Sequence, residues 1–63
     1  MLDNSIKARI EELFIACPDQ WSFEDSFVAI CKQLFMENKE FFVDTPQNRN
    51  AVYLHMDEIY EYI

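Results

Sequence analysis

Glycine is absent from the 63 residues, and proline and cysteine occur only twice each. Without glycine the chain lacks the residue that most easily adopts the positive φ angles of tight hairpin turns, which disfavours an all-β fold. Cys17 and Cys31 form no CxxC motif and fall on apolar stripes, so we expect both to be reduced core residues. Helices without disulfides should therefore dominate the fold.

Long apolar runs and basic residues are also scarce. No stretch of the sequence approaches the roughly 18 apolar residues of a membrane span, and the N-terminus lacks the basic and apolar segments of a signal peptide. We therefore expect a cytoplasmic protein that does not enter a membrane. Five Lys and Arg stand against twelve Asp and Glu, for a formal net charge of −7. This charge repels phosphate backbones and favours a basic protein partner over nucleic acid.

The chain is short for its apolar content. Apolar residues make up 51% of it and aromatic residues 16%. A single hydrophobic core usually stabilises a domain well only above roughly 70–80 residues. We expect one domain over residues 1–63, supplemented by assembly into a homodimer because no disulfide or metal is indicated.

An apolar stripe with helical spacing opens the chain. Its members are Ile6, Ile10, Leu13, Phe14 and Cys17. Asp3 or Asn4 can cap the first free N–H groups, and Pro18 ends the helix because it moves the preceding residue out of the α region. These signals predict a first helix over about residues 4–17.

A broader apolar face follows a short connection. Ser22 with Asp25 three residues later resembles a capping box and predicts a helix start. The apolar face consists of Phe23, Phe27, Ile30, Cys31, Leu34 and Phe35, and is widened by Val28, Ala29 and Met36. We predict a second helix over about residues 22–38, covered on several sides, with Asn38 as a left-handed cap in place of glycine.

Thr45 and Pro46 predict the start of a third helix, because proline suits the first helical position. The helix should run over about residues 45–62, with Val52, Met56, Ile59 and Ile63 as its apolar stripe. The apolar run before it predicts an extended connector over residues 40–44, whose best use would be pairing across a dimer. The sequence therefore predicts an all-α fold, a small three-helix domain.

The end of the third helix is the main candidate site. Tyr supplies rigid contact area and carboxylates complement Lys or Arg, a combination suited to a protein interface. The alternative is a solvated helix end, since carboxylates near the negative end of a helix dipole are mildly unfavourable. The candidate protein-binding residues are Tyr53, Asp57, Tyr60 and Glu61, together with Phe41 and Phe42 of the connector.

The start of the third helix is a second candidate site. Gln47, Asn48, Arg49 and Asn50 are residue types that recognition helices place against base edges in the DNA major groove. The net negative charge and the few Lys and Arg available for phosphate contacts argue against this interpretation.

No residue pattern indicates catalysis or a bound cofactor. The sequence has no Gly-rich phosphate loop and no nucleophile elbow, and it has one His to serve as a base. His55 and Glu58 form an i, i+3 pair, but no recognised ligand spacing accompanies them, so neither a metal nor a cofactor is expected.

We therefore expect a non-enzymatic, acidic protein-interaction module, such as an inhibitor, adaptor or regulatory subunit, that binds a basic protein. Two alternatives stay open. One is a small helix-turn-helix-like transcription regulator that reads DNA with residues 47–50. The other is a purely structural dimerisation domain.

Overall fold

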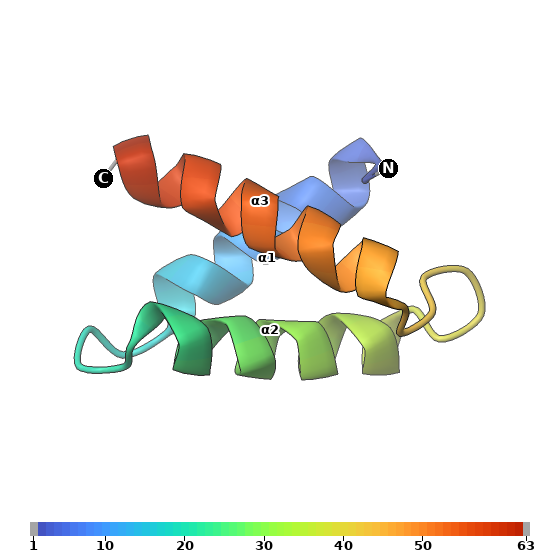
Figure 1. The fold of residues 1–63 in the computed structure, drawn as a ribbon, viewed down its shortest axis with the longest axis horizontal. Helices are drawn as coiled ribbons and strands as arrows, with labels where there is room; N and C mark the ends of the chain where they lie inside the picture. The colour runs from blue at the N-terminus through green and yellow to red at the C-terminus, as the bar shows by residue number, and fades with distance from the viewer. Residues whose placement is uncertain (1, 63) are drawn as a thin grey trace.

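Three helices account for most of the chain in the computed structural model, which describes residues 2–62 (Figure 1). They are α1 (Asn4–Ala16), α2 (Phe23–Glu37) and α3 (Pro46–Tyr62). Each helix contacts both of the others, and residues 2–62 contain no strand. The predicted all-α three-helix fold is confirmed, with helix ends within one residue of those expected. Ile63, expected on the third stripe, lies outside the described residues.

The path of the chain brings three helix ends together. In Figure 1, α2 and α3 lie one above the other and run in opposite directions, while α1 passes behind α3. The last turns of α1 and α3 and the first turn of α2 therefore meet at one end of the molecule. The connector between α2 and α3 lies at the opposite end.

Side-chain caps begin all three helices at the residues that the sequence indicates. The Asp3 carboxylate accepts a hydrogen bond at 2.8 Å from the backbone N–H three residues further on. The Ser22 and Thr45 hydroxyl oxygens accept equivalent bonds, each at 3.1 Å. Each cap satisfies one N–H group that has no partner within its helix.

The C-terminus of α2 differs from the prediction of a left-handed cap. Asn38 has a φ of −121° and a ψ of 30°, and no residue in the described part of the chain has a positive φ. Its backbone N–H and its side-chain Nδ2 both donate to the carbonyl of Leu34, at 3.0 and 2.9 Å. The side-chain amide caps the helix, so a glycine-like conformation is not needed.

The connector between α2 and α3 starts as a turn. The N–H groups of Phe41 and Phe42 both donate to the carbonyl of Asn38, at 3.0 and 2.8 Å. This turn directs Phe42 into the core, where it is 6% exposed and stacks on Phe35 with ring centroids 5.3 Å apart. The extended chain expected over residues 40–44 is therefore turned in its first residues, because burying an aromatic ring requires it.

The core lies where the three apolar stripes meet. Its buried apolar residues are Ile6, Ile10, Ile30, Cys31, Leu34, Phe42, Val52 and Met56. The expectation that α2 is covered on several sides is wrong, since Val28 and Met36 are 53% and 66% exposed. Two neighbouring helices cover one side of α2 and leave the outer side bare.

Candidate protein-binding surface

The charges of the chain are segregated along the sequence. Residues 11–31 and 50–62, here called the acidic half, contain none of the five Lys and Arg and eight of the twelve Asp and Glu. These acids are Glu11, Glu12, Asp19, Glu24, Asp25, Asp57, Glu58 and Glu61. The other four acids accompany all five cations, so the entire net negative charge belongs to the acidic half.

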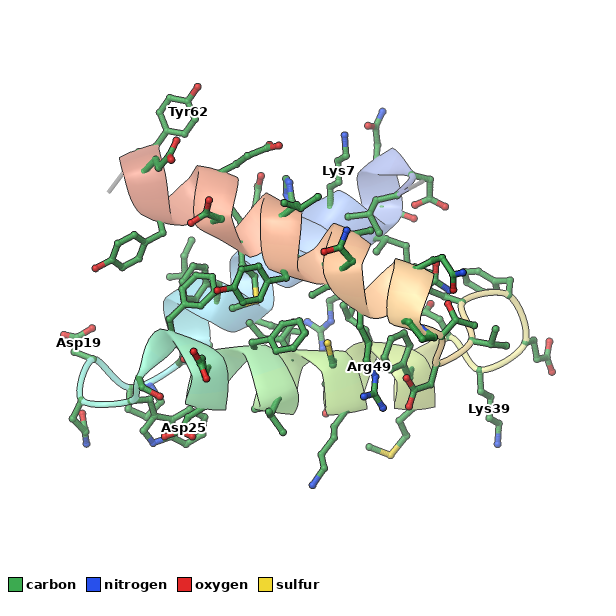
Figure 2. The ribbon with its side chains drawn as sticks, viewed as in Figure 1. Lys7, Asp19, Asp25, Lys39, Arg49 and Tyr62 are labelled. Atoms are coloured by element: carbon green, nitrogen blue, oxygen red, sulfur yellow. The ribbon has the colours of Figure 1, made fainter. Side chains whose placement is uncertain are left out.

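The fold converts this pattern in the sequence into a pattern in space. The acidic half combines the end of α1, the α1–α2 loop and the start of α2, which lie at one end of the molecule, with the part of α3 from residue 50, which extends from that end across the molecule (Figure 1). In Figure 2, the labelled Asp19 and Asp25 lie at this end, and the labelled Lys39 and Arg49 lie at the other. The molecule is therefore electrostatically polar along its length.

Two acids outside the acidic half, Glu37 and Asp44, are held by specific partners. Glu37 accepts two hydrogen bonds from Arg9, at 3.0 and 2.7 Å, and a third from Gln33 at 2.6 Å. The hydrogen bonds from Arg9 and Gln33 lower the pKa of Glu37 to about 2. Asp44 forms a similar two-bond pair with Arg49, at 2.6 and 2.8 Å. These two pairs are neutral, whereas Glu40, Lys7, Lys32 and Lys39 form no ion pair within residues 2–62.

Carboxylates of the acidic half are mostly unpaired. Among residues 2–62, no ion pair within 4.0 Å involves five of them, which are Asp19, Glu24, Asp25, Asp57 and Glu61. All five are exposed. They lie at a surface open to solvent, where a cationic partner could meet them.

The predicted residues of α3 lie together beside the start of α2. The ring of Tyr53 packs edge-on against Phe23 and Phe27, with centroids 5.1 and 5.3 Å apart, and Tyr60 packs against Phe23 at 5.9 Å. Tyr53 stays 39% exposed and Tyr60 62% exposed, and the intervening Asp57 is exposed. The same face carries Glu61, as the helical spacing predicts.

The two connector residues do not join this face. Phe41 is 70% exposed but belongs to the connector between α2 and α3, which lies at the opposite end of the molecule from the last turn of α3 (Figure 1). Phe42 is buried and stacked on Phe35, so it serves the core and offers no contact area to a partner. The candidate surface therefore consists of the α3 residues and the elements next to them.

An aromatic hollow of about 320 Å³ adjoins the exposed face of Tyr60. It lies between the end of α1, the loop over residues 17–22 and the start of α2, with Tyr60 contributed by α3. Four aromatic side chains line it, Phe14, Trp21, Phe23 and Tyr60. Asp19 is the one charged residue of its lining. The sequence does not predict this hollow, because it places Trp21 only in the loop between the first two helices.

His55 occupies a polar contact between α1 and α3. Its Nε2 lies 3.6 Å from a Glu11 oxygen and its Nδ1 lies 3.7 Å from a Glu58 oxygen. The side chain is 12% exposed, and Nε2 has no hydrogen-bond partner among the described residues. No group of three His, Cys, Asp or Glu in residues 2–62 has the arrangement of a metal site.

Two of the four candidate DNA-reading residues form hydrogen bonds within the protein. The Arg49 guanidinium is held by Asp44, and Asn48 donates from Nδ2 to the carbonyl of Val43 at 2.7 Å. Gln47 and Asn50 are exposed at the start of α3. A recognition helix needs its Arg and Asn side chains free to meet base edges, and two of these four are engaged within the protein.

No family model, curated protein or solved structure matches the chain. Within residues 2–62, no helix has both the length and the apolar character needed to cross a bilayer. Any assignment of function therefore rests on the geometry and charge described above.

Proposed function

We propose that the protein is a non-enzymatic interaction module whose acidic half binds a basic segment of another protein. The observation that carries this proposal is the segregation of charge, with eight acids and no Lys or Arg in residues 11–31 and 50–62. A surface of one sign steers an oppositely charged partner and raises its rate of encounter. An inhibitor, an adaptor or a regulatory subunit would each use such a surface.

Exposed aromatic rings within this surface support the proposal. Trp21 is 45% exposed and Tyr60 is 62% exposed, and both lie next to the unpaired acids. Tyr and Trp are enriched among the residues that carry most of the binding energy at protein interfaces. Solubility alone can account for a net charge of this size. It does not account for the concentration of the charge in one part of the molecule or for the exposed aromatic rings beside it.

A pair of charge-reversal variants tests the proposal with hexalysine as the probe. Glu61→Lys places a cation in the acidic half, and Glu40→Lys places one in the connector, while both variants carry a net charge of −5 instead of −7. We expect Glu61→Lys to weaken binding of hexalysine by about threefold or more and Glu40→Lys to change it far less, because the surface charge pairs involved are each worth about 0.2–1 kcal/mol.

Isothermal titration calorimetry at low salt measures both affinities. Equal weakening by the two variants would show that the probe senses only the net charge, and no binding of hexalysine to the wild-type protein would remove the basis of the proposal. Raising the salt to about 0.5 M should abolish binding, because it shortens the screening length from about 10 Å at 0.1 M to about 4 Å.

Self-association is a second candidate function, favoured by the bare outer side of α2. Val28 and Met36 lie two helical turns apart on this side, and Phe41 and Val43 of the connector are 70% and 52% exposed. A second copy of the chain could cover these apolar side chains. Light scattering across a dilution series tests it, since a mass that stays at twice 7.6 kDa supports a dimer and a monomer mass at all concentrations refutes it.

A further inference from the structure

The aromatic hollow has the features of a site for one cationic side chain. Its walls are Phe14, Trp21, Phe23 and Tyr60, and its one charged lining residue is Asp19. The rings of Phe14 and Tyr60 are nearly perpendicular to that of Phe23, with interplanar angles of 86° and 89°. Rings at such angles form a concave wall, whereas stacked rings would present a flat one.

Electrostatic surroundings of the hollow favour a cation. All residues that line it belong to the acidic half, which contains no Lys or Arg, and Glu24 and Asp25 follow Phe23 in the first turn of α2. The C-terminal ends of α1 and α3 meet here as well, and the carbonyl groups at a helix C-terminus carry partial negative charge. The faces of aromatic rings also carry partial negative charge and attract cations.

A larger hollow elsewhere in the bundle lacks these features. It measures about 350 Å³ and lies beside the start of α3, where its lining includes both Lys32 and the Arg49–Asp44 pair. Two cations at its wall would repel a third. Suitability for a cationic side chain is therefore a property of the aromatic hollow and does not follow from hollow size.

We propose that the aromatic hollow binds an arginine side chain of the basic partner, with the guanidinium between the rings of Trp21 and Tyr60 and near the Asp19 carboxylate. This inference rests on the proposed function, because it names the anchor of that interaction. Arginine fits better than lysine, since its planar and weakly hydrated guanidinium stacks on aromatic faces while the ammonium group of lysine keeps its water.

The test compares hexaarginine with hexalysine, which carry the same charge. Trp21 is the one tryptophan of the chain, so its fluorescence reports directly from the hollow. We expect the wild-type protein to bind hexaarginine about fivefold more tightly than hexalysine, the size of a cation–π contribution at an exposed site, and Trp21 fluorescence to change with the arginine peptide.

Tyr60→Leu is the informative variant and Tyr62→Leu is its matched control. Both remove an exposed tyrosine from α3, but Tyr62 is 91% exposed and does not line the hollow. We expect Tyr60→Leu to abolish the preference for arginine while hexalysine still binds, and Tyr62→Leu to keep the preference. Circular dichroism melting confirms that both variants fold.

Three results would overturn the inference. Equal affinity of the wild-type protein for both peptides, or a preference that survives Tyr60→Leu, would leave the acidic surface as a binding site without an arginine anchor. Failure of both peptides to bind at low salt would overturn the proposed function as well, so the two failures are distinguishable.

Discussion

Leu34→Ala should strongly destabilise the protein. Leu34 is fully buried on α2, at 0% exposure, in the cluster where the three helices meet. The substitution removes three carbon atoms from the core, which at about 0.8 kcal/mol each accounts for roughly 2.5 kcal/mol of lost burial. The cavity left behind raises the cost further, so we expect a total of about 2–5 kcal/mol.

This cost is large relative to the stability of so small a domain. At about 0.05–0.15 kcal/mol per residue, a chain of 63 residues has a free energy of unfolding of roughly 3–9 kcal/mol. Each kcal/mol lost lowers the melting temperature of a domain of this size by about 4–8 °C. We therefore expect Leu34→Ala to melt at least about 10 °C below the wild-type protein.

Thermal and urea unfolding followed by circular dichroism at 222 nm measure the effect. Leu54→Ala is the matched control, because it removes the same atoms from a helix position that is 53% exposed and should cost about 1 kcal/mol or less. The placement of Leu34 at the centre of the core would be refuted if its variant melted within 2 or 3 °C of wild type, or no lower than the control.

Three further predictions follow from individual contacts. The Arg9 and Gln33 hydrogen bonds hold the pKa of Glu37 at about 2, below its ordinary 4.5. The stability that this carboxylate contributes is therefore present above pH 4.5 and lost as the pH falls towards 2. Glu37→Gln should reduce this loss of stability at low pH, as measured by urea midpoints between pH 2.5 and 6. Ser22→Ala removes the cap of α2 and should cost about 1 kcal/mol in urea unfolding, whereas a midpoint equal to wild type would dismiss the cap. Burial raises the pKa of the Cys31 thiol to about 11, so a thiol reagent at pH 8 should modify the half-buried Cys17 first and Cys31 only in urea, with equal rates speaking against the burial.

Helix starts were predictable because their signals are local. The hydroxyl groups of Ser22 and Thr45 bond to N–H groups three residues further along the chain, so the residues that make the contact are neighbours in the sequence. The conformation that ends α2 was less predictable. Asn38 caps α2 through its side chain, and choosing between this geometry and a left-handed one requires knowing that Phe42 must return to the core.

The sequence could place candidate residues together within one helix but could not relate residues of different helices. Tyr53 and Tyr60 share a face because seven residues make almost two turns of α3. The aromatic hollow joins Trp21 of a loop to Tyr60 near the end of the chain, and no periodicity relates these two positions. The absence of Lys and Arg from residues 11–31 and 50–62 is visible in the sequence, but only the path of the chain shows that the end of α1, the start of α2 and the last turn of α3 meet at one end of the molecule.

The two-bond ion pairs of the bundle and the proposed binding surface lie in different parts of the molecule, and there is a physical reason for this separation. Arg9 forms a neutral ion pair with Glu37, and Arg49 forms one with Asp44, both outside the acidic half. In the acidic half, like charges repel, and Asp57 and Glu61 approach the negative end of the α3 dipole, so folding there places carboxylates closer together than the unfolded chain does. A domain of this size has few kcal/mol with which to offset that repulsion.

A basic partner that binds only the folded state would relieve this repulsion and raise the melting temperature in the same step. Salt would relieve the repulsion too, but it would weaken the partner's attraction, so the salt dependence of stability and that of binding should have opposite signs.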